Sequence, residues 1–167
     1  MPRSNHRRLG VAMDFSPCSV AALKWAVENF AREGDHIILL IIRPDVNYEH
    51  GEMQLWELTG APYIPLNEFT DAEVMKKYGL KPTPEAIEVS QKAAKDKKVE
   101  VLMKIFWGDP REKICQAVDS IPLEALFMGN RGLGPLQRAF MGSVSNYVVN
   151  HATCPVTVVK SDNQNKS

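Results

Sequence analysis

Two short segments carry residues that could bind a nucleotide. Residues 12–16 are Ala-Met-Asp-Phe-Ser, and the Asp14 carboxylate could accept a hydrogen bond from a ribose hydroxyl. Residues 128–134 contain Gly129 and Gly132, and glycines allow backbone amides to approach phosphate oxygens closely. The two segments therefore predict a carboxylate beside a phosphate-binding loop.

A helix start is predicted just after this loop, near Ser143. Gly142 and Ser143 are followed by Val144 and Ser145. The first backbone amides of a helix have no partner within the helix, and the helix dipole places positive charge at that end. Such a helix start would supply further hydrogen-bond donors to a phosphate.

The elements that must position these segments follow from hydrophobic patterning and helix-start signals. Short apolar runs predict five strands, at residues 9–13, 37–42, 99–106, 125–128 and 156–159. Four helices are predicted between them, opening at Ser16-Pro17, Thr83-Pro84, Asp109-Pro110 and near Ser143. This alternation predicts an α/β fold with a five-stranded parallel sheet, doubly wound into three layers in the Rossmann-like manner. Ligands of such sheets bind beyond the carboxyl ends of the strands, where both segments fall.

One domain is predicted over residues 1–160. The short polar segment 161–167 is expected to be a disordered tail. Residues 43–82 form a connection much longer than an ordinary loop, and aromatic residues such as Trp56 predict that this excursion is ordered. Its sequence does not indicate a role.

Composition excludes several classes of partner. The 20 lysines and arginines balance the 20 aspartates and glutamates, so nucleic acid is not expected as a partner because no overall positive field would attract it. No apolar run approaches the roughly 20 residues of a membrane span.

The basic start is followed almost at once by strand-like sequence, which predicts a cytoplasmic location. The three widely spaced cysteines (Cys18, Cys115, Cys154) match neither a disulfide framework nor a zinc pattern.

The glycine spacing resembles a known pattern. Gly129, two residues, Gly132, nine residues and then Gly142-Ser143 resembles the ATP-binding motif of the universal stress protein family. Residues 11–16 and 151–156 also resemble segments of that family, and the resemblance extends over about residues 7–160. The excursion at 43–82 resembles that of plant-type single-domain members.

This resemblance implies an adenine nucleotide α-hydrolase-like fold and a site for ATP, ADP or AMP, with Mg²⁺ possible beside a triphosphate. The implied nucleotide-binding residues follow the first, second and fourth predicted strands: Ala12, Met13, Asp14, Phe15, Ser16, Ile41 or Ile42, Met128, Gly129, Arg131, Gly132, Gly142, Ser143, Val144 and Ser145. It also implies a homodimer formed through the last strand, which agrees with an apolar strand at residues 156–159 that no later helix covers.

The function expected from these observations is that of a stress-response regulator or switch that binds an adenine nucleotide and turns it over little. The chain has no GxxxxGK[ST] motif, and its glycine-rich loop does not follow the first strand as a dinucleotide fingerprint would. Two alternatives stay open, a slow ATPase and a chaperone-like, partner-binding protein in which the nucleotide is structural. The glycines could serve only a turn, Asp14 could serve only a helix start, and Arg131 could be an ordinary surface charge.

Overall fold

The structure is a computed structural model that describes residues 6–44, 56, 59–130 and 137–160, with residues 137–141 described by their backbone alone. The predicted tail at 161–167 lies outside the described residues. Among the described helices, none combines the length and the apolar character that crossing a membrane requires.

A six-stranded sheet forms the centre of the fold, in the order β3-β4-β2-β1-β5-β6. Five strands run parallel, as predicted: β1 (Arg8–Ala12), β2 (His36–Arg43), β4 (Glu100–Trp107), β5 (Ala125–Gly129) and β6 (Val156–Val159). The sixth strand, β3 (Ile64–Pro65), pairs antiparallel with β4 and was not predicted. Two residues, one of them proline, are too few to show a strand pattern.

Three of the four predicted helices begin where the capping signals predict, and two short helices within residues 66–76 were not predicted. The described helices are α1 (Pro17–Asn29), α3 (Leu66–Phe69), α4 (Ala72–Lys76), α5 (Pro84–Lys92), α6 (Pro110–Ser120) and α7 (Gln137–His151). A π-helical turn, Ala93–Lys97, follows α5. The side chains of Ser16, Thr83 and Asp109 accept hydrogen bonds from amides in the first turns of α1, α5 and α6.

The exception is α7, which begins at Gln137 and not near Ser143. Gly142 and Ser143 therefore lie within the helix, so the prediction of a helix mouth at these residues is wrong. Residues 137–141 are Gln-Arg-Ala-Phe-Met and include no glycine or proline. The helix therefore begins five residues before Gly142, the residue that was taken for its start.

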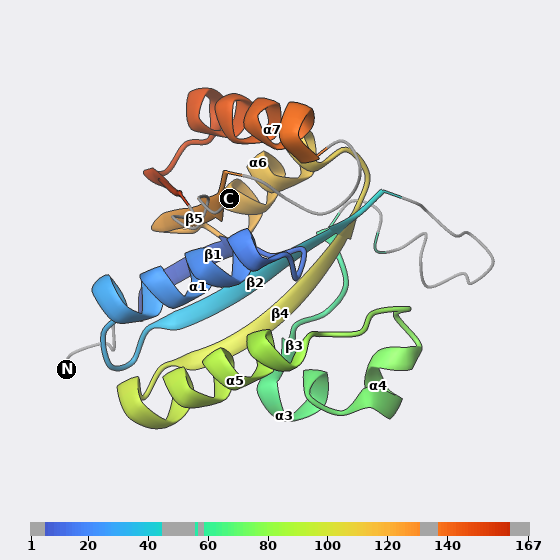
Figure 1. The fold of residues 1–167 in the computed structure, drawn as a ribbon, viewed down its shortest axis with the longest axis vertical. Coiled ribbons are helices and arrows are strands. Elements are labelled where there is room, and N and C mark those ends of the chain that lie inside the picture. The colour runs from blue at the N-terminus through green and yellow to red at the C-terminus, as the bar shows by residue number, and fades with distance from the viewer. Residues whose placement is uncertain (1–5, 45–55, 57–58, 131–136, 161–167) are drawn as a thin grey trace, which may run out of the picture.

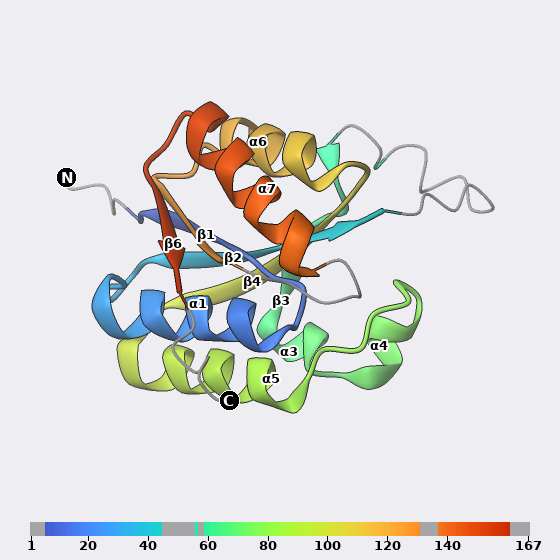
Figure 2. The same ribbon diagram turned by 45° about the horizontal axis from the view of Figure 1, so that its top comes forward.

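Three layers result, with helices on both faces of the sheet (Figure 1). Figure 2 shows α1 and α5 on one face and α6 and α7 on the other. Side chains of β2 alternate between two buried clusters, since Ile37, Leu39 and Ile41 pack on the α1 side, whereas Ile38 and Leu40 pack on the α6 side. A strand buried on both faces explains the continuous apolar run in the sequence.

The residue before β1 and the residue before β2 form a partly buried ion pair. Arg7 donates to both carboxylate oxygens of Asp35, with Nη2 to Oδ2 at 2.7 Å, and its guanidinium lies 4.6 Å from the centre of the Phe30 ring. Burial alone would raise the pKa of Asp35, but hydrogen bonds from Arg7 and from the Arg32 amide outweigh that effect and lower it. Asp35 is only 3% exposed, so loss of Arg7 would leave a buried carboxylate without its ion-pair partner.

The described part of the excursion packs against β4. Trp56 stacks on Trp107 with ring centres 5.7 Å apart, and the Ala61 amide donates to the Ile105 carbonyl at 2.8 Å. Lys104 Nζ donates to the Ala61 carbonyl at 2.6 Å, and burial lowers the pKa of this lysine. These contacts attach residues 59–69 to the outer edge of the sheet.

Candidate functional site

A cleft opens at the point where the strand order reverses. β1 has β2 on one side and β5 on the other, so the connections from β1 and from β5 leave in opposite directions. This is where doubly wound sheets bind ligands. The cleft has a volume of about 160 Å³ and is lined from both sides of the switch point by Ala12, Met13, Asp14, Ser19, Leu40, Ile42, Pro110, Ile114, Met128, Gly129 and Val144.

The loop after β1 presents Asp14 to the cleft. Asp14 Oδ1 accepts a hydrogen bond from the Ser16 amide at 3.0 Å, and the Asp14 amide donates to Ser19 Oγ at 3.3 Å. Phe15 has a φ of 64°, an unusual conformation for a residue with a side chain, which makes the sharp bend into α1. The carboxylate is therefore held in a fixed loop at the rim of the cleft.

Phe15 and Ser16 do not line the cleft. Phe15 packs against the hydrophobic cluster on the α1 side, and the buried Ser16 hydroxyl accepts from the Ser19 amide at 3.2 Å. Both residues shape the loop that carries Asp14.

The end of β2 contributes one of its two isoleucines. Ile42 lines the cleft, whereas Ile41 points to the opposite face and is buried under α1. Successive side chains of a strand alternate between faces, so only one of the pair can face the cleft.

The end of β5 meets the start of α1 at close range. A Cβ built on Gly129 would lie 2.8 Å from the carbonyl oxygen of Cys18 and 2.9 Å from its carbonyl carbon. Gly129 therefore has a packing requirement of its own in addition to lining the cleft beside Met128. The next residue, Asn130, has a buried Oδ1 with no hydrogen-bond partner among the described residues.

The residues predicted on α7 are separated by the turn of the helix. Val144 lines the cleft, whereas Ser143 is exposed outside it. Ser145 is buried, and its hydroxyl donates to the Gly142 carbonyl at 3.2 Å. A Cβ on Gly142 would meet no described atom within 4 Å. Arg131 and Gly132 lie outside the described residues.

Four lining residues were missed by the sequence reasoning: Ser19, Leu40, Pro110 and Ile114. Ser19 lies three residues after the cap Ser16, where a first-turn side chain points back toward the capping loop. Leu40 shares the face of Ile42 because it lies two residues earlier on β2. Pro110 and Ile114 belong to α6, whose start follows β4 directly.

The start of α6 adds a charged pair near the cleft. The side chain and the amide of Arg111 donate hydrogen bonds to Asp109, and they lower the pKa of that carboxyl group. Asp109 is thus occupied as a helix cap. Within the described part of the chain, no group of three or more histidine, cysteine, aspartate or glutamate side chains could hold a metal ion. The cleft offers an apolar floor, one carboxylate and a serine hydroxyl.

The universal stress protein family model matches residues 5–160. The chain is 32% identical over 170 residues to the universal stress protein PHOS34 of Arabidopsis thaliana, covering 92% of this chain and 62% of that protein. The chain therefore spans less than two thirds of the length of this relative.

Two solved structures share the fold. The universal stress protein UspA of Lactobacillus plantarum has a TM-score of 0.62 and 23% identity, with 94% of this chain and 99% of that chain covered. A universal stress protein family protein of Arabidopsis thaliana with AMP bound has a TM-score of 0.58 and 20% identity, with 96% of each chain covered. These likenesses establish an adenine nucleotide α-hydrolase-like α/β fold with a mainly parallel sheet.

Proposed function

The chain belongs to the universal stress protein family, and on that premise we propose that it binds an adenine nucleotide in the cleft between the ends of β1 and β5. The observation that carries the proposal is the position of this cleft at the strand-order switch, with an apolar floor and Asp14 at its rim. The AMP-bound relative with the same fold supports the choice of ligand.

The cleft suits the base of the nucleotide. Its 160 Å³ is small beside the roughly 300–1,000 Å³ of ordinary ligand pockets, so it would hold the adenine while ribose and phosphates extend beyond it. Ala12, Ile42 and Val144 are the apolar residues that would contact the ring. The Asp14 carboxylate would accept from a ribose hydroxyl.

Two features near the end of β5 and the start of α7 fit a ligand. The unpartnered Oδ1 of Asn130 is a buried acceptor, and such groups normally have a partner; a ribose hydroxyl or the adenine amino group, not a phosphate oxygen, could donate to it. Gly142 occupies a helix interior, where glycine costs about 1 kcal/mol relative to alanine. No described atom needs the space left by its missing side chain, so a nearby ligand would account for the glycine. Arg131, Gly132 and Ser143 are the residues that we propose to contact phosphate, with Mg²⁺ arriving on a triphosphate.

We propose a regulatory role with little turnover. Asp14 is the one carboxylate among the described residues that line the cleft, and its Oδ1 is engaged by the Ser16 amide. A hydrolase of nucleotides needs one group to position water and others to hold a metal ion. A single carboxylate assigned to ribose leaves no described group for the attacking water.

We also propose a homodimer formed through β6. Among the strands that the structure describes, β6 lies at the edge of the sheet and pairs with β5 alone. An edge strand with apolar side chains is a ready template for a second copy. The Leu126 amide bonds to the Pro155 carbonyl, so by alternation the backbone groups of Val156 and Val158 face outward.

Isothermal titration calorimetry with ATP, ADP and AMP tests the nucleotide proposal. Asp14→Asn keeps an oxygen for the Ser16 amide but loses the charge, so it should weaken binding about tenfold or more. Asp96→Asn, on the exposed π-helical turn, is the matched control and should bind like the wild type. Absence of binding by the folded wild-type protein would refute the proposal. Phosphate release at the roughly 1–1,000 turnovers per second typical of enzymes would refute the regulatory role.

A further inference from the structure

The loop between β1 and α1 is organised around the hydroxyl group of Ser19. The Asp14 amide and the Ser16 hydroxyl both donate to Ser19 Oγ, each at 3.3 Å. The same oxygen lies 3.0 Å from the Ser16 carbonyl oxygen and 3.3 Å from Met13 Sδ, either of which can accept its proton. Ser19 is only 4% exposed, so water competes little for these bonds.

The hydrogen-bonding capacity of this hydroxyl is used up inside the loop. A serine hydroxyl has one proton to donate and two lone pairs with which to accept. The Asp14 amide and the Ser16 hydroxyl occupy the lone pairs, and the Ser16 carbonyl or the Met13 sulfur takes the proton. Ser19 lines the cleft, but it has no hydrogen bond left to offer a ligand. Its influence on a ligand must therefore pass through the groups that it holds.

The tie to the Asp14 amide matters most, because the backbone next to it is strained. Phe15 has a φ of 64°, a conformation that a residue with a side chain adopts only at a cost. The bond from the Asp14 amide to Ser19 Oγ fixes the chain directly before this bend, and the Ser16 amide holds Asp14 Oδ1 directly after it. Without the Ser19 hydroxyl the Asp14 amide would lose this acceptor, and the bend could relax and carry the carboxylate with it.

We propose that Ser19 is a positioning residue for Asp14 and thereby sets a preference of the cleft for ribonucleotides over deoxynucleotides. The inference rests on the proposed nucleotide site, in which the Asp14 carboxylate accepts from a ribose hydroxyl. A carboxylate held in place loses a charge-assisted hydrogen bond when the nucleotide lacks that hydroxyl. A carboxylate on a relaxed loop makes the bond poorly, so it distinguishes the two nucleotides less.

Titration calorimetry with ATP, 2′-deoxy-ATP and 3′-deoxy-ATP tests this role. The wild type should bind ATP about tenfold or more tightly than at least one of the two deoxynucleotides. Ser19→Ala should lose most of that preference, because its Asp14 is no longer held. Ser19→Thr keeps a hydroxyl and should keep the preference. A merely structural role for Ser19 would instead weaken all three nucleotides alike and leave their ratio unchanged.

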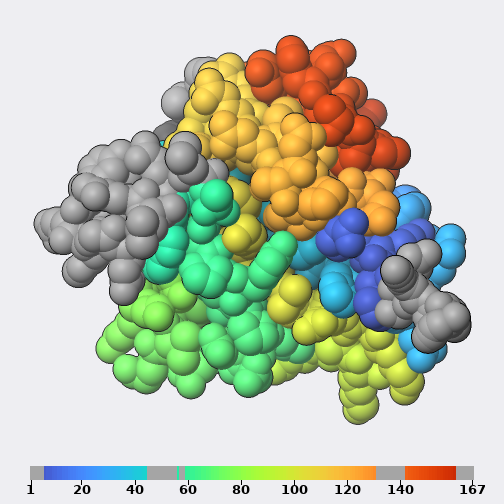
Figure 3. All heavy atoms as spheres, turned by 180° about the vertical axis from the view of Figure 1, so that it is seen from behind, coloured from blue at the N-terminus to red at the C-terminus, as the bar shows by residue number. Residues whose placement is uncertain are grey.

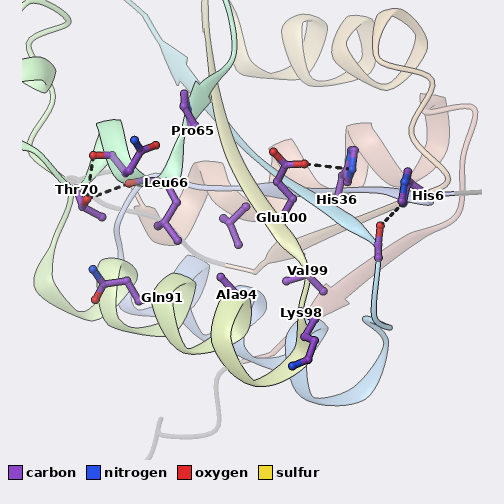
Figure 4. A pocket seen from close by; sticks show the side chains of 13 residues that line it. His6, His36, Pro65, Leu66, Thr70, Gln91, Ala94, Lys98, Val99 and Glu100 are labelled. Atoms are coloured by element: carbon purple, nitrogen blue, oxygen red, sulfur yellow. Dashed lines mark hydrogen bonds and ion pairs between the residues drawn. The ribbon is translucent and has the colours of Figure 1, made fainter. Parts of the chain in front are cut away.

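A groove at the opposite end of the sheet supplies the place for a matched control. It has a volume of about 800 Å³ and lies where β4 begins, with Gln91 on one side and Leu66 on the other (Figure 4). In the space-filling view of Figure 3, the segment containing β3 and α3 lies next to the start of β4 on this face. Lys98 and Glu100 line the groove with opposite charges, and no residue lines both the groove and the cleft.

The control residue is Ser90, which directly precedes Gln91 on α5. Ser90 is fully buried, and its hydroxyl donates to the Ala86 carbonyl at 2.8 Å. It therefore resembles Ser19 in burial and in bonding to the backbone of the preceding turn, but it lies outside the cleft lining. Ser90→Ala should keep both the ATP affinity and the preference of the wild type.

The outcomes separate this inference from the proposed function. Failure of the wild type to bind ATP overturns both. Binding of ATP without a preference over either deoxynucleotide leaves the nucleotide site standing and overturns the inference. An unchanged preference in Ser19→Ala overturns the role of Ser19 alone. If Ser19→Ala does not fold, Ser19→Cys keeps the size of the side chain with a weaker hydrogen-bonding group, and the same ratio is measured with it.

Discussion

Two glycines of the proposed nucleotide site should respond in opposite ways to the same substitution. In Gly129→Ala, the new methyl group would lie 2.8–2.9 Å from backbone atoms of Cys18, a separation that real Cβ atoms essentially never show. The backbone of α1 must shift, because no flexible side chain can move aside. Overpacking of this kind costs about 1–3 kcal/mol, which for a chain of this size corresponds to a fall in Tm of roughly 2–12 °C.

Gly142→Ala should instead stabilise the free protein. The new methyl group meets no described atom within 4 Å, and alanine is favoured over glycine in a helix interior by about 1 kcal/mol. The expected rise in Tm is therefore roughly 2–4 °C. If a nucleotide approaches this position, the same methyl group should weaken its binding.

Differential scanning calorimetry with and without ATP, combined with titration calorimetry, separates the two roles. Gly129→Ala should lower Tm in both conditions, whereas Gly142→Ala should raise Tm without ATP and gain less from ATP than the wild type does. A normal Tm for Gly129→Ala would refute the packing argument. Unchanged ATP affinity in Gly142→Ala would show that the helix glycine does not face the nucleotide.

Three further predictions concern stability, assembly and the excursion. Asp35→Asn should lower the free energy of unfolding by about 3 kcal/mol at neutral pH. Because the folded-state pKa of Asp35 is lowered, the stability advantage of the wild type is complete above pH ~4 and shrinks as the pH falls through the folded-state pKa. Urea titrations of both proteins at pH 7 and pH 3 would show this difference. Val158→Pro removes an outward-facing amide of β6 and should shift a dimer to monomer in light scattering, so a monomeric wild type would contradict the dimer. Trp56→Ala removes the stack on Trp107 and should lower the free energy of unfolding by about 2 kcal/mol, because a half-buried tryptophan contributes roughly half as much as a buried one. Limited proteolysis should then cut residues 59–82 faster. Unchanged cleavage would show that the stack does not hold the excursion.

Sequence patterns were sufficient for the parallel part of the fold because its signals are local and strong. β2 is apolar along its length since it is buried on both faces, and three helices carry a capping side chain followed by proline. The patterns failed where tertiary pairing decides. β3 exists because Ile64 lies opposite Met103, and nothing within a two-residue segment shows that pairing.

The position of the cleft was predictable at the ends of β1 and β5, and its lining by α7 was less so. Asp14 and Gly129 follow apolar strands, and parallel strands bring their carboxyl ends to one edge of the sheet. The start of α7 was predicted six residues too late because Gly142 was taken for a helix boundary, although a helix interior tolerates a glycine at modest cost. Ser19, Leu40 and Ile114 enter the cleft from three elements, so only the packed fold brings them together.

The described part of the excursion is held to the sheet beside the cleft. The chain leaves β2 after Arg43, which follows the cleft residue Ile42 and lies opposite Trp107 of β4. Trp56 stacks on that same Trp107, and the Ala61 amide donates to the Ile105 carbonyl. A nucleotide-dependent change at the end of β2 would therefore reach the excursion next to the Trp56 stack, which is the contact that the Trp56→Ala proteolysis measures.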